Sequence, residues 1–488
     1  MPFTDGSSQL EPLLFQMKSY KNLTKSTIEI LPSSGQTSYG PNQKVIFTLP
    51  YASTISLEDL ALHFTFTSKN LAVASSVADG GATVCIEKIT APRDVASLIS
   101  EIDIKINGQT IQHLTRYNDI VNLLNKFKEI GPNNGTLSKQ IVEPDAAFNS
   151  DYSIHPTSGA VINGTKDVAR DEVDNIVSSR NIVNSWYGLL GHRGKEVSSN
   201  FIDTNMLGEV TIAFTLAPPS VCPALFKTAA NAKTGTTVGL DDAEYNSAKD
   251  NRKTSYQLSD LKMSMVRYNL PQGYSEALSS NLSGGAKYQI AFNHYEFHTQ
   301  NAGKSNGTIR WNENSRDIKG LLAFFTDNSR DLSNVPSDYV TADNISKYFV
   351  YENTIHDNSQ FQIGSVKMPQ NSLKNEECFL ELCRGMADDR GLTKWNYGNN
   401  SFGLMPAYLQ FHFMVYLSLE MTEGVNKEAE FGKKLLSGLS SEQLPISCSY
   451  SYNNLPAPGY IWDKSINVMS LTTRMLVIEQ GQNVHVEI

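Results

Sequence analysis

The clearest pattern of apolar and polar positions lies between residues 101 and 129. Ile102, Ile104 and Ile106 alternate with polar residues, which is typical of a β-strand with one buried and one solvated face. Asn107-Gly108 follows, a dipeptide that tolerates positive φ and favours a tight hairpin turn. The spacing of apolar residues then changes to three and four, which predicts an amphipathic helix. The apolar stripe of this helix consists of Tyr117, Ile120, Val121, Leu124 and Phe127.

A similar order of patterns returns between residues 361 and 389. Phe361, Ile363 and Val366 predict a short strand that Pro369 ends. A second helical stripe follows, made of Phe379, Leu382, Cys383 and Met386. Either segment alone would be weak evidence, but a strand, a turn and a helix used twice indicate a structural repeat. We therefore predict two similar all-β domains in tandem.

Alternation of apolar and polar residues also predicts most of the other strands. It occurs at residues 45–49, 60–66, 210–216, 261–265, 288–292, 321–325, 409–419, 446–452 and 475–488. Many short strands with polar loops and only two or three helices favour sandwiches or barrels over a parallel α/β sheet. We expect two tandem eight-stranded sandwiches with short helices in their loops.

The length of 488 residues fits two β domains rather than one compact domain. Weak periodicity and many small polar residues predict a long loop excursion at 130–205. The polar stretch 228–255 has the composition of a linker. The expected divisions are an N-terminal segment at 1–25, a first sandwich at 26–222, a linker at 223–255 and a second sandwich at 256–488.

The N-terminal segment has its own helical pattern. Apolar residues recur at helical spacing, and Pro12 lies near the first turn, where proline is tolerated. One interpretation is that this amphipathic helix packs on its own domain, and another is that it reaches a neighbouring subunit or a membrane surface. The candidate interaction residues are Leu10, Leu13, Leu14 and Met17.

Charge and composition narrow the class of protein. The net charge is −9, and Lys and Arg are scattered with no basic arm, which argues against direct nucleic-acid binding. No apolar run reaches about 18 residues, and the N-terminus lacks the pattern of a secretory signal. The five cysteines are widely spaced, as expected for reduced thiols. We therefore expect a protein that is made in the cytoplasm and is not secreted.

The sequence predicts no catalytic residue, no cofactor and no metal site. It contains no phosphate-binding glycine loop, no nucleophile elbow and no zinc-type spacing. His294 and His298 are the nearest approach to a metal pair, but they would lie about 13 Å apart along a strand. We interpret them as solvated strand histidines. Cys378 and Cys383 are poorly placed to share a ligand and are expected in the core.

Several segments of the sequence resemble the double jelly-roll major capsid proteins of DNA viruses. IEILPSSGQTSYGPNQKVIFTLP, followed by LEDLALHFTF, resembles the first long strands of that family, and SEIDIKINGQTIQHLTRYNDIVNLL its strand–turn–helix unit. The counterparts in the second domain are SRDIKGLLAFFTDNSRD, FQIGSVKMPQ with its following helix, and GKKLLSGLSSEQLPISCSYSYN. The similarity runs from about residue 27 to the C-terminus and depends on order and spacing, while the 130–205 excursion matches no part of the family.

The resemblance implies a homotrimer with a pseudo-hexagonal outline that tiles an icosahedral shell, often over an internal membrane. The implied partners are further copies of the chain and minor capsid or penton proteins, without sequence-specific nucleic-acid binding, and the implied location is the virion. The resemblance assigns Leu10, Leu13, Leu14 and Met17 to contacts under the shell. It assigns residues 130–205 and 326–356 to an outer tower or a clasp between subunits.

Two other functions remain compatible with the sequence. A jelly-roll lectin or receptor-binding spike would use the 130–205 excursion as its recognition loop. A carbohydrate-active enzyme would need two carboxylates facing each other across a groove, and the sequence places no such pair.

Overall fold

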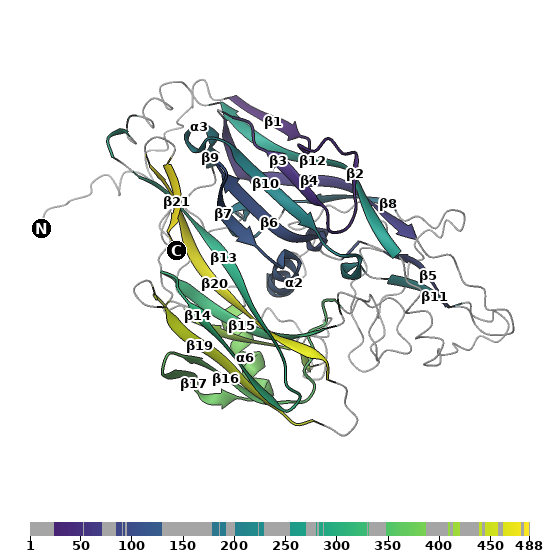
Figure 1. Cartoon of the computed structure of the whole chain (residues 1–488), viewed down its shortest axis with the longest axis vertical. Coiled ribbons are helices and arrows are strands. Elements are labelled where there is room, and N and C mark those ends of the chain that lie inside the picture. The colour runs from purple at the N-terminus through teal and green to yellow at the C-terminus, as the bar shows by residue number, and fades with distance from the viewer. Residues whose placement is uncertain are drawn as a thin grey trace, which may run out of the picture.

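The structure is a computed structural model of the whole chain. It describes residues 24–51, 53–70, 84–89, 91–92, 95–128, 178–184, 186–191, 201–222, 224–228, 254–269, 280, 283–285, 287–328, 330, 348–386, 408–409, 413–419, 439–441, 445–456, 462–479 and 483–487. The described residues form two β-sandwiches in one chain, joined end to end along the long axis of the molecule (Figure 1).

The first sandwich has two main sheets of antiparallel strands. The larger sheet has the order β1-β12-β4-β8, with β2 on β12 and β9 on β4, and the smaller has the order β3-β10-β6-β7. The strands of the larger sheet are β1 (Thr24–Ile30), β2 (Ser38–Tyr39), β4 (Thr54–Asn70), β8 (Ser178–Val183), β9 (Phe201–Asp203) and β12 (Thr254–Asn269). Those of the smaller sheet are β3 (Lys44–Thr48), β6 (Ile99–Ile106), β7 (Gln109–Leu114) and β10 (Val210–Leu216). A separate pair joins β5 (Val84–Ile89) to β11 (Ala224–Thr228).

The second sandwich repeats this arrangement. One sheet has the order β13-β20-β15-β18 with β21 on β20, and the other has the order β14-β19-β16-β17. The strands are β13 (Tyr288–Asn301), β14 (Asn306–Glu313), β15 (Ile318–Asp327), β16 (His356–Ile363), β17 (Val366–Leu373), β18 (Met414–Ser418), β19 (Ile446–Asn454), β20 (Lys464–Glu479) and β21 (Asn483–Glu487). The prediction of two all-β sandwiches is confirmed: an eight-stranded order occurs twice among the described residues, with additional strands beside it.

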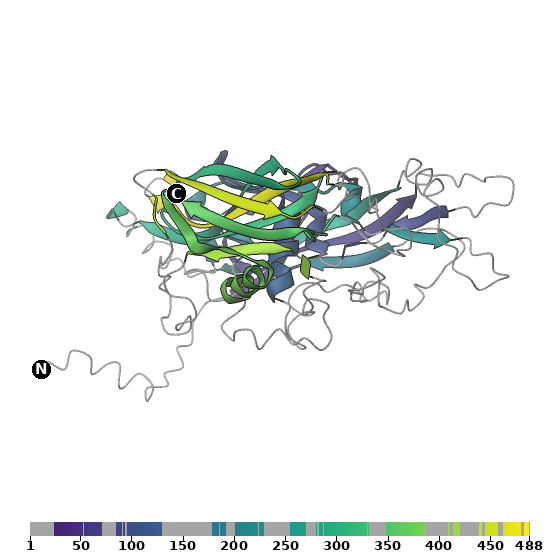
Figure 2. The same ribbon diagram turned by 90° about the horizontal axis from the view of Figure 1, so that it is seen from below.

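The two sandwiches match strand by strand in chain order. Counting the eight strands that the two sandwiches share, the first lies beside the last, the third borders the last on its other side, and a helix follows the fifth. This is the jelly-roll arrangement of two packed four-stranded sheets. The helices are α2 (Tyr117–Lys128) and α6 (Asn375–Met386), and both lie on the same face of the molecule (Figure 2). The repeated strand–turn–helix unit read from the sequence is therefore present as β6-β7-α2 and β16-β17-α6.

The predicted start of the second sandwich at residue 256 is corrected by the pairing of β12. Met263 lies opposite Leu62 of β4 on one side and opposite Ile30 of β1 on the other, all antiparallel. Strand β12 therefore closes the first sandwich, and the second begins at β13. Alternation at 261–265 shows that a strand exists, but not which strand it pairs with, because partner choice depends on contacts distant in the sequence.

Two other predicted segments contain strands. The linker at 223–255 includes β11, which pairs with β5, and the excursion at 130–205 includes β8 and β9, which pair with β4. The parts of the excursion at 130–177 and 192–200 lie outside the described residues, as do residues 1–23 with Leu10, Leu13, Leu14 and Met17. The first strand begins at Thr24, close to the predicted end of the N-terminal segment.

Short helices complete the described fold: η1 (Val95–Leu98), α3 (Thr204–Leu207), η2 (Gly188–Leu190) and η3 (Pro219–Val221). No helix in the described part of the chain is long and apolar enough to cross a membrane. The apolar cores of the two sandwiches are continuous, because buried residues of both belong to one packed cluster. The contact through which they join contains a buried ion pair.

Candidate functional site at the contact between the two sandwiches

The sandwiches meet where β7, α2 and η2 of the first face the edge strand β13 of the second (Figure 1). Gln112 on β7 donates a hydrogen bond from Nε2 to the backbone oxygen of Asn293 on β13, at 3.0 Å. Tyr187, just before η2, packs edge-to-face on Tyr295 with 6.2 Å between ring centroids. These contacts bury polar and aromatic groups of both sandwiches together.

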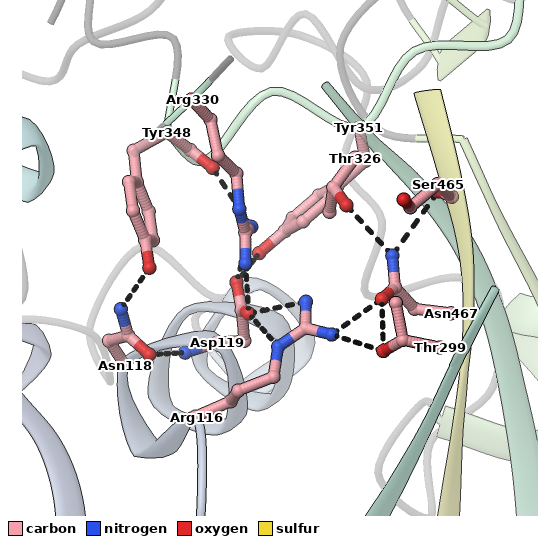
Figure 3. Close-up of polar contacts among 10 residues, drawn as sticks. All are labelled: Arg116, Asn118, Asp119, Thr299, Thr326, Arg330, Tyr348, Tyr351, Ser465 and Asn467. Atoms are coloured by element: carbon pink, nitrogen blue, oxygen red, sulfur yellow. Dashed lines mark hydrogen bonds and ion pairs between the residues drawn. The ribbon is translucent and has the colours of Figure 1, made fainter. Parts of the chain in front are cut away.

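The start of α2 directs charged groups into this contact. Arg116 has a positive φ of 53°, which turns the chain sharply after β7. Its carbonyl accepts hydrogen bonds from the backbone N–H groups of Asp119 and Ile120, at 2.9 and 3.2 Å. The turn leaves the Arg116 guanidinium and the Asp119 carboxylate in the first helical turn, on the side that faces the second sandwich (Figure 3).

Asp119 is the centre of a buried ion-pair cluster. Arg330, from the segment after β15, donates from Nη1 to Oδ1 at 3.0 Å and from Nη2 to Oδ2 at 2.7 Å. Arg116 donates from Nε to Oδ2 at 2.8 Å, and the Tyr351 hydroxyl donates to Oδ1 at 3.3 Å. Asp119 is 0% exposed and Arg330 6%. The Asp119 carboxylate of the first sandwich thus forms a bidentate ion pair with the Arg330 guanidinium of the second (Figure 3).

The cluster keeps its charges despite burial. Burial by itself raises the pKa of Asp119, but the Arg330 and Arg116 guanidinium groups outweigh it and lower this pKa to about 2. Burial works against the charge of Arg330, yet the adjacent Asp119 carboxylate raises the Arg330 pKa above its usual value. Burial raises the pKa of Tyr351 well above its usual value, so the hydroxyl keeps its proton and donates. At neutral pH the pair is ionic.

A second branch of contacts leads from Arg116 to the sheet of the second sandwich. Its Nη1 donates to the Thr299 hydroxyl at 3.0 Å and to the Asn467 side-chain oxygen. Asn467 in turn donates from Nδ2 to the Thr326 hydroxyl at 2.8 Å. The guanidinium also lies over the Phe324 ring, 5.7 Å from its centroid. Arg116 therefore connects α2 to strands β13, β15 and β20 at once (Figure 3).

A third branch centres on Tyr348. Asn118 of α2 donates to the Tyr348 hydroxyl at 2.7 Å, and the Arg330 guanidinium stacks over the Tyr348 ring at 4.4 Å. The same ring packs with Ala217 and Val221, which follow β10 of the first sandwich. Both the helix and the loop after β10 thus hold one aromatic side chain of the second sandwich.

The arrangement is suited to holding the sandwiches at a fixed angle rather than to catalysis. Each charge in it faces an opposite charge or a hydrogen-bond partner in the other sandwich, and the Asp119–Arg330 pair is closed off from solvent while Arg116 is partly exposed. No group of three or more His, Cys, Asp or Glu side chains could hold a metal ion within the described ranges. The sequence patterns missed these residues because Asp119 and Arg330 are 211 residues apart.

The histidines and cysteines singled out from the sequence lie elsewhere. The interpretation of His294 as solvated is wrong: it is 6% exposed, and burial together with the nearby Arg474 lowers its pKa to about 3. His298 stacks on Trp311 with 5.5 Å between ring centroids. Cys378 is buried as expected, and the Cys383 side chain lies outside the described residues. The described ends of segment 326–356 contact the first sandwich of the same chain, through Arg330 and Tyr348.

Comparison with known proteins finds similarity in structure only. No protein-family model matches the chain, and no curated protein sequence matches it. A structure of the Sputnik virophage aligns over 97% of this chain and 89% of its own, with 11% identity and a TM-score of 0.55. The PBCV-1 virus capsid aligns over 96% and 98%, with 11% identity and a TM-score of 0.53.

The Faustovirus major capsid protein gives a third match, over 96% of this chain and 92% of its own, at 9% identity and a TM-score of 0.52. All three alignments span both sandwiches, and at such low identity they establish the fold. The strand order found twice in this chain and these alignments lead to one conclusion. The chain has the double jelly-roll fold of viral major capsid proteins.

Proposed function

We propose that this chain is a major capsid protein whose copies form pseudo-hexameric homotrimers that tile an icosahedral virus shell. The observation that carries the proposal is the same eight-strand order occurring twice in one chain. Alignment with capsid chains over nearly their full length supports it. In this role the protein is structural and not an enzyme.

Duplication gives a physical reason for the trimer. Two similar sandwiches per chain become six in three copies, so one gene product can present nearly sixfold edges to its neighbours. A shell built from such units needs stiff β cores and complementary edges. The buried contact around Asp119 and Arg330 supports this, because it fixes the two sandwiches of a chain relative to each other.

The proposal also names partners and a location. The chain would contact further copies of itself and minor capsid or penton proteins, and would face an internal membrane where the shell encloses one. Its place would be the virion, after synthesis in the host cytoplasm. With a net charge of −9, it would leave contact with the genome to other components.

The N-terminal segment receives a role under the same proposal. Its apolar stripe would make contacts beneath the shell, so deletion of residues 1–20 should leave trimers intact and impair assembly of particles. Normal particles from the deleted protein would overturn this role. The residues concerned are Leu10, Leu13, Leu14 and Met17.

The direct test is the assembly state of the purified protein. Size-exclusion chromatography with light scattering should give a three-copy species, and negative-stain microscopy should show pseudo-hexagonal capsomers that associate into closed particles. A protein that stays single-copy under all assembly conditions and binds an immobilised glycan would overturn the proposal in favour of a receptor-binding function.

A further inference from the structure

Lys319 of β15 is a buried lysine whose amine lies against an amide. Its side chain is 7% exposed, and its Nζ donates a hydrogen bond to Oδ1 of Asn293 on β13 at 2.8 Å. Asn293 is neutral, so this contact supplies no counter-charge to an ammonium group. Lys464 of the same sandwich is 8% exposed and shows the usual arrangement, since its Nζ lies 2.9 Å from the Glu352 carboxylate. Lys319 therefore differs from an ordinary buried ion pair.

Strand pairing brings Lys319 and Asn293 to one face of the sheet. Strands β13 and β15 both pair with β20, which lies between them (Figure 1). Asn293 lies opposite Thr473 of β20, and residues opposite each other in an antiparallel pair share a face. The register of β15 on β20 shifts at Lys319, which is the extra residue of a bulge. The long Lys319 side chain thus spans β20 to reach Asn293.

A buried carboxyl group belongs to the same part of the sheet. Asp317 is 0% exposed, and its carbonyl accepts a hydrogen bond from the backbone N–H of Thr473 at 2.9 Å. Because Ile318 pairs with Thr472, Asp317 falls opposite Thr473, on the side away from Asn293. It therefore shares the face that carries Asn293. An amide, an amine and a carboxyl group gather around one position of β20.

Neighbouring elements cover this position. Gln112 of the first sandwich donates from Nε2 to the backbone oxygen of Asn293 at 3.0 Å. From the other side Tyr416 of β18, which is 5% exposed, packs against Gly320, next to Lys319 in the chain. The cover limits access of bulk water to the amide, which favours attack by an amine held beside it over hydrolysis.

We infer that Lys319 and Asn293 condense to form an isopeptide bond between their side chains. The unprotonated Lys319 amine attacks Cγ of Asn293, the Nζ–Cγ bond forms, the Cγ–Nδ2 bond breaks, and Nδ2 leaves as ammonia. Asp317 takes one proton from Nζ and delivers it to the departing Nδ2. An amine and a carboxamide thus give a secondary amide and ammonia, and the step consumes no oxidant, reductant or cofactor.

The hydrogen bond holds the reacting atoms close to each other before the reaction. An acceptor oxygen 2.8 Å from Nζ, at the end of a C=O bond of about 1.2 Å, places Cγ about 3–4 Å from the nitrogen. Fixing two groups near this separation accelerates reactions that are very slow between free groups. The product is neutral, so its formation also removes the cost of burying an ammonium group against an amide.

The bond ties β13 to β15 across β20 and closes a covalent loop between residues 293 and 319. Such a cross-link restricts the unfolded chain and slows loss of the sheet. The same sheet receives Arg116 of the first sandwich at Thr299 and Asn467, so the link stiffens the surface on which the contact between the sandwiches is built. The bond forms within one chain and does not depend on assembly.

Intact mass and peptide mapping of the purified full-length protein test the inference. The denatured wild-type chain should be lighter than the mass calculated from its sequence by one ammonia. Trypsin should release residues 288–304 joined to residues 317–330 as one branched peptide, because it does not cleave after an acylated lysine. Fragmentation should place the link between Lys319 and Asn293. Mapping is needed because an Asn-Gly pair such as Asn107-Gly108 also loses ammonia when it cyclises.

Substitutions test the role of each group. Lys319→Arg keeps a positive charge and hydrogen-bond donors but removes the nucleophilic amine, so its mass should equal the calculated value and the branched peptide should be absent. Asn293→Ala should give the same result. Asp317→Asn should leave most chains unlinked at a time when the wild type is fully linked. The matched control is Lys464→Arg, which alters an equally buried lysine and should keep the branched peptide.

Far-UV circular dichroism and thermal midpoints check that each variant is folded. A wild-type mass that equals the calculated value after prolonged incubation at neutral pH would overturn the inference, as would an ammonia loss that maps to another asparagine. Complete linkage in folded Asp317→Asn would overturn the role given to Asp317. The proposed capsid function is judged separately, by the assembly state of the protein.

Discussion

The substitution Asp119→Asn tests whether the buried ion pair holds the two sandwiches together. Asn keeps the shape of the side chain and one acceptor oxygen, but removes the negative charge that faces Arg330 and Arg116. Arg330 remains 6% exposed and cannot turn to solvent without leaving its stack on Tyr348. The variant therefore leaves a buried guanidinium without a counter-charge.

The expected loss of stability follows from that uncompensated charge. Breaking a buried pair by removing one partner costs about 3–5 kcal/mol. The lowered pKa of Asp119, about 2, gives a smaller figure of about 2 kcal/mol for the charged over the protonated carboxyl. The first figure is the relevant one, because the pKa compares two protonation states whereas Asp119→Asn also removes an acceptor from Arg330. Since the retained amide oxygen still accepts one hydrogen bond, we expect about 3 kcal/mol.

Urea unfolding of the full-length protein, followed by circular dichroism, measures this loss. Arg330→Met should cost a similar amount, whereas the double variant should cost clearly less than the sum, because it leaves no unpaired buried charge. The control is Lys287→Met, which breaks an exposed surface pair with Glu479 and should leave the urea midpoint close to that of wild type. Stability of Asp119→Asn within 1 kcal/mol of wild type, or strict additivity in the double variant, would refute the reasoning.

Gly188 and His294 give two further predictions at the same contact. Gly188 has φ of +81° and an added Cβ would lie 2.6 Å from Gln112 Oε1, so Gly188→Ala should cost about 2–4 kcal/mol in urea unfolding. The control is Gly364→Ala, at φ +59° in open space, which should cost only about 1 kcal/mol. Equal costs of the two substitutions would contradict the prediction. His294 stays neutral in the fold with a pKa of about 3, while the unfolded chain takes up a proton below about pH 6.5, so stability falls as pH drops through that window. His294→Phe should reduce the loss between pH 7 and pH 5 by about 2 kcal/mol, and an unchanged pH dependence would exclude His294 as its source.

Local pattern was enough to predict the repeated unit. In β6, Ile102, Ile104 and Ile106 are buried while Asp103 and Lys105 between them are partly exposed, as their alternation predicts. The turn at Asn107-Gly108 has positive φ at both residues. These features depend on neighbours within a few residues, which is the range over which hydrophobic periodicity carries information.

Pairing between distant strands could not be predicted from the local sequence pattern. Residues 409–419 alternate along their whole length, yet the described strand there begins only at Met414 and ends at Ser418. In β15 both faces are buried, because one face lies in the core and Phe324 on the other meets Arg116 of the first sandwich. A period-two pattern reports that a strand has one apolar face, but not what covers its second face.

The two helices show why the buried cluster could not be read from the chain. Arg116 and Asp119 in one unit and Lys374 and Glu377 in the other have the same charges at the same spacing, typical of a solvated helix start. In the first unit Asp119 is buried against Arg330 with Arg116 partly buried beside it, whereas in the second unit Lys374 and Glu377 are exposed. The sequence signal is therefore the same for a helix start that is buried and for one that is exposed. What distinguishes them is a guanidinium 211 residues away in the chain, so the buried ion pair is visible only in three dimensions.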